Sequence, residues 1–536
     1  MAALPAETDI LVIGAGSAGC VLADRLSADA RRRVLVLEAG GPDLSPYLHV
    51  PAGITKVIGN PAHDWGLLAE PDPTRAGKVD LWPAGKGLGG SSSINGMLYV
   101  RGSHADYDRW EALGNQGWGW ATMAPLFRRL ERTRIGDPAW RGREGRQIVE
   151  RLRSQHPLGV AFIAAAQEAG LPFNDDYNGA SQEGVGHPQV TQLCGRRFSA
   201  ARAYLPATRD RWNVSVRTGA LVERLLIEKG RCVGVRVRFG GAVQEVRARE
   251  VIVAAGALQT PKLLMLSGIG PADELRAQGL EVIHDSPNVG LHLQDHPNAT
   301  VSVDVNISTY NAEVNGPNRL LHALRWLMFR TGPATSPYPH AVAFMKSSPD
   351  EPEPDIQIML GPFAFELTPE GIQPYLKPAV TGVASLSYPR NSGRVRLRSA
   401  RVEDAPIIEH ALLDHPEDCR RLIAGARYLR TIFRSPAYAA SVIREREPGP
   451  EVQTEADWDA YLRATTFLGY HPIGTARMGP NAEDAVDARL RVRGVSGLRV
   501  VDASVFPHHM SGNINADVMA VAERASDMVI EDWAAG

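Results

Sequence analysis

Three glycines near the start of the chain have the spacing that phosphate binding requires. Gly14, Gly16 and Gly19 form a G-x-G-x-x-G pattern, and Glu38 follows further along the chain. In this pattern the first glycine permits a tight turn, the second lets the backbone approach a pyrophosphate, and the third lets a helix pack on a strand. The phosphate charge lies at the helix N-terminus, and the acid can accept hydrogen bonds from ribose hydroxyls. These residues therefore predict a dinucleotide site.

The segments around these glycines are the ones that such a site needs. Residues 10–13 form an apolar run that is typical of a buried parallel strand, and a second apolar run, 34–37, ends at Glu38. Between them, four apolar residues fall three to four positions apart and so make one helix face: Ala18, Val21, Leu22 and Leu26. We therefore predict a βαβ unit over residues 8–40. The unit alone does not say which dinucleotide it binds.

The composition excludes several classes of protein. Lys plus Arg is 58 and Asp plus Glu is 60, so the formal net charge is −2. A charge so nearly balanced gives no reason to expect nucleic acid or an anionic membrane as a partner. The four cysteines lack C-x-x-C spacing, which argues against a zinc site or a disulfide framework and fits a reducing compartment. No metal site is expected.

The N-terminal residues have neither the basic nor the apolar part of a signal peptide. No stretch reaches the ~20 apolar residues that span a bilayer. We therefore expect a cytoplasmic protein without an integral membrane segment.

Changes of pattern along the chain predict an α/β fold with two domains. Alternating strand-like stretches and amphipathic helical stretches fill the region after residue 298, whereas buried parallel-type strands return at 251–254 and 498–501. We expect a discontinuous Rossmann-like domain joined to an α+β substrate domain with an antiparallel sheet. The Rossmann-like domain would comprise residues 1–155, 211–298 and 455–536, and the substrate domain would comprise residues 156–210 and 299–454.

Four separated stretches of the chain carry a family likeness. They are VIGAGSAG…LEAG, GKGLGGSSSINGMLYVRG (85–102), GALQTPKLLMLSGIGP (256–271), and HPIGTARMG (471–479) with the final segment 500–524. Together they resemble the glucose–methanol–choline (GMC) family of flavin oxidoreductases, in the family's order and nearly end to end. The likeness is loosest between residues 299 and 450. It implies that the Rossmann-like domain binds FAD, not a nicotinamide, and that the protein oxidises an alcohol to an aldehyde or ketone.

The resemblance also implies where each part of FAD would lie. The ADP half would lie at the N-terminal glycines, and the backbone of Val222 would contact the adenine. The pyrophosphate and flavin would lie along the loop that contains Gly89, while Asp502 would close on the ribityl chain. Ile94 stands where relatives with covalently attached flavin have a histidine, so FAD is expected to bind non-covalently. The expected cofactor residues are Gly14, Gly16, Ser17, Ala18, Gly19, Glu38, Ala39, Gly89, Ser91, Asn95, Gly96, Val222, Ala255, Asp502 and Ala503.

The chemistry is expected at His471 and Asn513, which match the family's two polar positions at the site. Pro472 favours an extended conformation at His471. Oxidation of an alcohol requires that the hydroxyl proton move to a base while the carbinol hydride moves to flavin N5. A neutral imidazole suits the proton step. We therefore predict that His471 is the base, and that Asn513 hydrogen-bonds the same substrate oxygen.

Four aromatic residues are the predicted substrate contacts: Tyr99, Tyr470, Phe363 and Phe365. If they line the pocket, the substrate is an apolar or aromatic primary alcohol and not a free sugar. His296 is expected to have a structural hydrogen-bonding role, and His508 and His509 to lie behind the site or on the surface.

Other functions remain open at this point. A choline-type dehydrogenase would need a carboxylate and an aromatic cage for the quaternary ammonium, and Glu366 is in a plausible region for it. A hydroxynitrile-lyase-like enzyme or a redox-inactive flavin-binding protein would use the same scaffold without net electron transfer. The acceptor that reoxidises the flavin is oxygen or another electron acceptor.

Overall fold

The N-terminal segment folds as the βαβ unit that its glycines predict. The strands β1 (Glu7–Ile13) and β2 (Val34–Glu38) lie parallel, and α1 (Ser17–Leu26) connects them. All five residues of β2 are buried, as the unbroken apolar run predicts. The computed structural model describes residues 3–313, 318–336, 338–368 and 371–535, with the backbone alone described at 366–368 and 371–373.

Around this unit lies a seven-stranded sheet in the order β11-β2-β1-β14-β13-β12, with β27 paired to β14. Four of its pairings are parallel, whereas β12, β13 and β14 pair as antiparallel hairpins. Since β27 comes from the C-terminal segment, the sheet is completed only late in the chain. The further strands are β11 (Val214–Thr218), β12 (Ala220–Glu228), β13 (Arg231–Phe239), β14 (Ala242–Val253) and β27 (Leu498–Val500).

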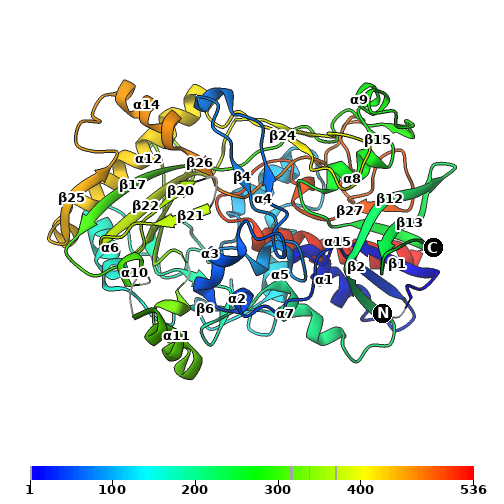
Figure 1. The fold of residues 1–536 in the computed structure, drawn as a ribbon, viewed down its shortest axis with the longest axis horizontal. Helices are drawn as coiled ribbons and strands as arrows, with labels where there is room; N and C mark the ends of the chain where they lie inside the picture. The colour runs from blue at the N-terminus through cyan, green and yellow to red at the C-terminus, as the bar shows by residue number, and fades with distance from the viewer. Residues whose placement is uncertain (1–2, 314–317, 337, 369–370, 536) are drawn as a thin grey trace.

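The second sheet also has seven strands, and every pairing in it is antiparallel. Its order is β25-β17-β22-β19-β18-β7, with β26 paired to the start of β17. Figure 1 shows this sheet at one end of the molecule and the first sheet, with both chain termini, at the other. The strands are β7 (Gly184–Gly186), β17 (Pro297–Val305), β18 (Ala341–Met345), β19 (Ile356–Gly361), β22 (Ala379–Leu386), β25 (Val442–Glu447) and β26 (Phe467–Leu468).

Two helices, α6 (Pro157–Glu168) and α12 (Pro416–Arg434), pack on the second sheet. The spacing of the buried residues in α12, with Leu422, Ala426 and Leu429 along one face, lets it lie on β17 and β22. All eight residues of β22 are buried, so both faces of this strand are covered. Together the two sheets confirm the predicted α/β fold, with an antiparallel sheet in the second domain.

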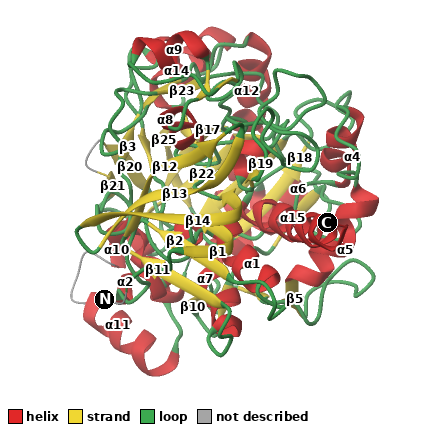
Figure 2. Ribbon diagram, turned by 90° about the vertical axis from the view of Figure 1, so that its right-hand side faces the viewer, coloured by secondary structure: helices red, strands yellow, loops and turns green. Residues whose placement is uncertain are grey.

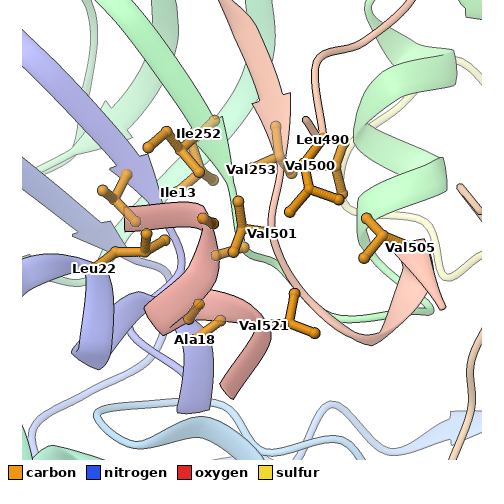
Figure 3. Close-up of a cluster of buried hydrophobic side chains, with 14 of the residues drawn as sticks. Ile13, Ala18, Leu22, Ile252, Val253, Leu490, Val500, Val501, Val505 and Val521 are labelled. Atoms are coloured by element: carbon orange, nitrogen blue, oxygen red, sulfur yellow. The ribbon is translucent and has the colours of Figure 1, made fainter. Parts of the chain in front are cut away.

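The core of the first domain joins the two ends of the chain. Helix α1 packs against α15 (Asn515–Ala535), and Ala18 and Leu22 of α1 lie in the same apolar cluster as Val521 of α15 (Figure 3). Val253 and Val500 close this cluster from the neighbouring strands β14 and β27. Burying each aliphatic side chain of this size stabilises the fold by roughly 1.5–3 kcal/mol. The C-terminal helix is therefore held on the dinucleotide-binding unit.

The remaining helices and strands are short and lie mainly around the two sheets (Figure 2). The helices are α2 (Pro46–His49), α3 (Ile54–Val57), α4 (His104–Ala112), α5 (Trp120–Leu130), α7 (Ala200–Tyr204), α8 (Thr260–Leu266), α9 (Ala272–Ala277), α10 (Tyr310–Glu313), α11 (Asn318–Phe329), α13 (Pro436–Ala439) and α14 (Glu455–Thr465). The strands are β3 (Leu67–Leu68), β4 (Leu81–Trp82), β5 (Glu131–Thr133), β6 (Gln147–Arg151), β8 (Gln189–Val190), β9 (Gln192–Leu193), β10 (Arg196–Arg197), β15 (Ile269–Gly270), β16 (His284–Asp285), β20 (Phe365–Thr368), β21 (Gly371–Pro374), β23 (Arg394–Arg396) and β24 (Ile407–Glu409). Among the described residues, no helix combines the length and the apolar character needed to cross a bilayer.

The structure differs from the expected domain segments at residue 455. We assigned residues 455–536 to the FAD-binding domain, yet α14 packs on α12 and β26 extends the second sheet. The substrate domain therefore continues through Leu468, because an amphipathic helix and two strand residues complete its layers before the chain crosses over. Within the segment 156–210, α7 packs on α1 of the first domain, whereas β7 joins the second sheet.

Candidate active site

A cavity of about 710 Å³ runs between the two domains. At one end it is lined by the β1–α1 turn, with Gly14 and Gly16, and at the other by His471 and Asn513. The structure thus brings the predicted phosphate-binding turn and the predicted catalytic pair to a single cavity, although they are far apart in the sequence.

Two of the N-terminal glycines are required by the backbone. Gly14 has a φ of +101°, and a Cβ there would overlap the carbonyl of Ala254, directly after β14. A Cβ at Gly19 would overlap the Gly14 carbonyl, so this glycine allows α1 to start close to β1. Gly16 precedes the first residue of α1, and Ser17 and Ala18 line the cavity. The N-terminus of α1 therefore opens directly into the cavity, where an anion would be favoured.

Glu38 closes this end of the cavity and also holds the surrounding loops together. Its carboxylate accepts hydrogen bonds from the backbone N–H of Ala15 (2.8 Å), Gly40 (2.8 Å) and Gly87 (3.0 Å). Burial raises the pKa of this carboxyl group. Glu38 and Ala39 both line the cavity, so Glu38 can face a ribose while it ties the first glycine turn to the loop at residue 87.

The loop that contains Gly89 lies along the cavity as a 3-10 turn, Gly90–Ser93. The N–H of Gly89 donates to the Ala15 carbonyl (2.8 Å), which fixes the loop against the first turn, although Gly89 itself does not line the cavity. Asn95 is held by the guanidinium of Arg197, which donates to its Oδ1 (2.8 Å). The residues of this loop that line the cavity include Gly90, Ser91, Ile94, Asn95 and Gly96.

Asp502 is fixed on the opposite wall. Its carboxylate accepts from the N–H of Gly256 (2.9 Å), the hydroxyl of Thr260 (2.6 Å) and the N–H of Ser504 (2.8 Å). Burial raises the pKa of Asp502. The structure thus joins the second signature stretch to the C-terminal one at this wall. The other predicted cofactor residues that line the cavity here are Val222, Ala255 and Ala503.

These features fit FAD. The cavity is long enough to connect a helix N-terminus with a pair of polar side chains at its far end, and glycines stand where a Cβ would collide with the backbone. The acids Glu38 and Asp502 are already oriented by backbone donors at separate points of the cavity.

At the reacting end, a buried carboxylate positions the backbone of His471. Asp295 accepts from the N–H of His471 (2.7 Å), of His296 (2.8 Å) and of Tyr470 (2.9 Å). Burial raises the pKa of Asp295 to about 7. Tyr470 has a φ of +63°, an unusual conformation for a residue with a side chain. Asp295 therefore holds a strained turn that aims His471 into the cavity.

A chain of hydrogen bonds fixes the tautomer of His471. His296 Nε2 lies 3.0 Å from the Met510 carbonyl, which can only accept, so this nitrogen carries the proton. Burial lowers the pKa of His296 to about 4, which leaves its Nδ1 unprotonated at neutral pH. That atom lies 3.0 Å from Nδ1 of His471, so the Nδ1–H of His471 must be the donor. The remaining nitrogen, Nε2 of His471, keeps its lone pair.

The side-chain amide of Asn513 faces that lone pair. Its Nδ2 donates to Nε2 of His471 (3.0 Å), and Gln357 Nε2 donates to its Oδ1 (3.1 Å). Gln357 therefore fixes which way the Asn513 amide points. Desolvation by the surrounding protein lowers the pKa of His471 well below its ordinary value, and the neighbouring imidazole of His296 adds to the effect.

A third imidazole completes the cluster. The ring of His509 lies 3.7 Å from that of His296, centroid to centroid, and its Nε2 donates to the backbone carbonyl of His471 (3.1 Å). Its Nδ1 accepts from the N–H of Met510. His509 and His296 thus lie behind His471, as expected of them. Asp295 and Gln357 have no signal in the sequence, because the first is brought beside residues 467–471 by the pairing of β17 with β26 and the second is placed by the pairing of β19 with β22.

Three of the four predicted substrate contacts lie at the cavity, namely Tyr470, Phe363 and Phe365. The prediction for Tyr99 is corrected: its ring is buried in the core of the first domain, while the adjacent Leu98 faces the cavity. Consecutive residues in extended backbone point to opposite sides, so only one of the two can reach the substrate. Further residues that line this end are Asn298, Tyr338, Met359, Val383 and Phe467.

A mostly parallel sheet with a helix N-terminus at a long cavity, capped by an antiparallel domain, suits an enzyme that binds a dinucleotide cofactor. Comparison with known proteins gives the family. Two GMC oxidoreductase family models match the chain, the N-terminal one over residues 8–298 and the C-terminal one over residues 389–522. The chain belongs to the GMC oxidoreductase family, and it is a flavoprotein that acts on CH–OH donors.

Individual relatives agree with this assignment. The chain is 39% identical over 533 residues to an alcohol dehydrogenase [acceptor] of Pseudomonas putida, covering 97% of this chain and 95% of that protein. It is 39% identical over 544 residues to an oxygen-dependent choline dehydrogenase of Sinorhizobium fredii, covering 98% and 96%. The crystal structure of pyridoxine 4-oxidase from Mesorbium loti superposes with a TM-score of 0.88 at 31% identity, covering 98% of this chain and 99% of that one.

Proposed function

We propose that the protein oxidises a primary, apolar or aromatic alcohol to the aldehyde, with His471 as the base. The observation that supports this most directly is the unprotonated Nε2 of His471, which the contacts from His296 and Met510 leave as an acceptor at the cavity. The FAD that these residues fit supplies a two-electron acceptor for the carbinol hydride when it is bound.

Asn513 marks the place of the substrate oxygen. Its Nδ2–H lies on the His471 lone pair, so a hydroxyl group that enters between them would donate to Nε2 and accept from the amide. As the carbon loses its hydride, the hydroxyl proton passes to Nε2 of His471, and the C–O bond becomes a carbonyl. The Asn513 amide would stabilise the negative charge that develops on that oxygen.

The low pKa of His471 is useful in this scheme. A histidine with an ordinary pKa would be partly protonated near neutral pH and would lose part of its base form. Burial favours the neutral form of His471, which is the form that has a free lone pair for the proton.

The walls of the reacting end support an apolar substrate. Phe363 and Phe365 lie 5.8 Å apart, centroid to centroid, and the ring of Tyr338 lies edge-on to Phe365 at 6.3 Å. Aromatic rings in such a cluster favour an aliphatic chain or an aromatic ring over a strongly hydrated sugar.

Choline is the second candidate substrate, because choline dehydrogenases are among the relatives at 39% identity. A quaternary ammonium would call for a free carboxylate near the aromatic rings. The acids among the described residues that line the cavity are otherwise engaged: Glu38 and Asp502 accept from backbone N–H groups, and Asp80 pairs with Arg75. At the reacting end stands the neutral amide of Asn298. The side chain of Glu366 lies outside the described residues.

We further propose that FAD is held non-covalently, because Ile94 lines the cavity and offers no nucleophile for attachment. Precipitation with acid should leave the yellow flavin in the supernatant. A yellow protein pellet would overturn this part of the proposal.

The location we propose is the cytoplasm, in keeping with the free cysteines Cys20, Cys194, Cys232 and Cys419.

The substrate is tested by mixing the FAD-loaded protein, without oxygen, with 1-octanol, benzyl alcohol or choline. We expect the yellow flavin absorbance to bleach with the first two and much more slowly with choline. Bleaching by choline alone would favour the second candidate, and no bleaching by any alcohol would favour a lyase or a redox-inactive protein. Repeating the reaction with oxygen or an artificial acceptor then shows which of them reoxidises the flavin.

A further inference from the structure

Helix α11 presents its apolar face to solvent. Five side chains at positions i, i+1, i+4, i+7 and i+8 form this face, and all are exposed: Leu320 (69%), Leu321 (62%), Leu324 (43%), Leu327 (59%) and Met328 (65%). In a globular protein a stripe with this spacing normally faces the core. Here the contact with the body of the protein is made by Trp326, whose indole N–H donates to the Gly195 carbonyl (2.9 Å).

The charges on α11 have one sign. Arg319 and Arg325 lie in the helix, Arg330 follows it, and no acid occurs between residues 318 and 330. Among the described residues, none of these three arginines is paired with a carboxylate: Arg325 donates to the Thr331 hydroxyl, and Arg330 stacks on Trp326 at 3.9 Å. The nearest acid in the sequence, Glu313, is paired with His322 instead (3.0 Å).

The exposed face continues beyond the helix. Both ribbon views place α11 at the edge of the molecule, beside α2 (Figures 1 and 2). The 3-10 turn after α11, Pro333–Thr335, contacts the turn Pro51–Gly53, which in turn contacts α2. Leu44 and Tyr47 in this region are 79% and 51% exposed. Asp43, the acid beside them, interacts with the charge of Arg202.

We propose that this face, α11 with its three arginines, docks the protein on the surface of an anionic lipid bilayer. A helix of 12 residues is about 18 Å long, which suits a position in the plane of the interface and not a span across it. The leucines enter the boundary between headgroups and acyl chains, and the exposed Arg319 and Arg325 meet the lipid phosphates.

A second copy of the chain is the less suitable occupant. In a two-fold symmetric dimer the same patch meets itself, so the arginines of two α11 helices would be brought close together. The balanced net charge of the whole chain does not argue against the bilayer, because charges beyond a Debye length of about 8 Å are screened and the local arginines dominate.

Docking would bring one wall of the cavity close to the membrane. Ile54 and Thr55, directly after the turn Pro51–Gly53, line the cavity, as does Tyr338, which follows the turn after α11. The proposal does not depend on which alcohol the protein oxidises.

Sedimentation with vesicles tests this. The FAD-loaded protein is mixed at low salt with vesicles of phosphatidylglycerol and phosphatidylcholine, or of phosphatidylcholine alone. We expect binding to the first and much weaker binding to the second. The triple variant Leu320→Ser, Leu324→Ser, Leu327→Ser should lose at least about tenfold in partitioning. Each of Arg319→Gln and Arg325→Gln should lose about fivefold.

The control is Trp212→Ser, which removes an equally exposed apolar side chain (77%) from the other domain and should bind as the wild type does. All variants are checked for bound flavin and unchanged circular dichroism. Equal vesicle binding by the wild type and the triple variant would overturn the proposal. So would a wild type that ignores anionic vesicles but forms a dimer that the triple variant loses, because the occupant would then be a second copy.

Discussion

The two ends of the cavity are built in different ways. At the phosphate end the contacts come from backbone groups and glycines that lie within one βαβ unit and one loop, fixed by Glu38. At the reacting end they come from side chains on separate segments, in the chain Gln357, Asn513, His471, His296 and Met510. The glycine turn and its loop thus rest largely on local geometry, and the surroundings of His471 rest on tertiary structure.

This difference has a physical reason. A pyrophosphate is recognised by backbone N–H groups that any sequence supplies, provided glycine allows the close approach. A base must be held in one tautomer and one orientation, which requires partners whose own protons are fixed. Substitutions at the phosphate end should therefore remove FAD, whereas substitutions at the reacting end should slow the reduction of the flavin.

The largest effect, complete loss of bound FAD, is expected from a substitution at the phosphate end of the cavity. Gly14→Val would force a β-branched residue into a φ of +101° and drive its Cβ into the Ala254 carbonyl, so the purified protein should contain no FAD. Gly41→Ala, where nothing lies within 4 Å of the new Cβ, is the matched control and should remain yellow. Flavin absorbance per protein measures both. A yellow Gly14→Val protein would show that the turn does not need its glycine.

At the reacting end, His471→Ala should keep FAD and lose turnover. Removal of a positioned base lowers the rate of flavin reduction by ~10²–10⁴. Stopped-flow mixing with alcohol under anaerobic conditions measures this rate, and free imidazole should restore part of it. Reduction at the wild-type rate, with the flavin in place, would rule out His471 as the base.

His296 acts through His471 and should have a smaller effect. His296→Ala removes the acceptor that holds the Nδ1 proton, so both tautomers of His471 become populated. We expect flavin reduction to slow by roughly 10- to 100-fold, in the range of a lost orienting partner, with the substrate KM nearly unchanged. A raised KM with an unchanged rate of reduction would indicate a substrate contact instead.

The smallest effect is expected at Gln357. In Gln357→Leu the Asn513 amide loses the donor to its Oδ1, and part of the population turns its oxygen toward His471. The rate of flavin reduction should fall severalfold, on the order of one lost neutral hydrogen bond. Gln357→Glu offers no donor when ionised and should resemble the leucine variant. Activity of the glutamate variant equal to the wild type would exclude an orienting role.

The sequence was sufficient for the fold of the βαβ unit and only partly for the surroundings of His471. The spacing of Gly14, Gly16 and Gly19 carries its own structural context, because the strand and helix on either side are local. His471 and Asn513 were predicted from motifs, but Asp295 and Gln357 depend on strand pairings with no short-range signal. Tyr99 was misplaced because the side to which an extended residue points is decided by packing, and Leu98 takes the cavity side.

The domain boundary near residue 455 also depends on strand and helix contacts that have no short-range signal in the sequence. Residues 455–468 precede the catalytic segment and were grouped with it. In the structure they complete the antiparallel sheet, because α14 covers α12 and Phe467 pairs with Asn298. The same pairing brings His296 beside His471, so one tertiary contact moves the boundary and brings the two imidazoles together.

The most direct test of a neutral, buried base is the pH dependence of flavin reduction by alcohol, measured anaerobically. Protonation would remove the acceptor lone pair of His471, and burial lowers its pKa, so the loss of activity must occur on the acid side of the ordinary histidine value of 6.5. We predict that the fall in the rate constant caused by protonation of His471 lies below pH 6.5, and that any change near pH 7 comes from Asp295 and is absent from Asp295→Asn. In Asp295→Asn, a rate that already halves near pH 6.5, or that rises as the pH falls, would contradict a neutral imidazole as the base.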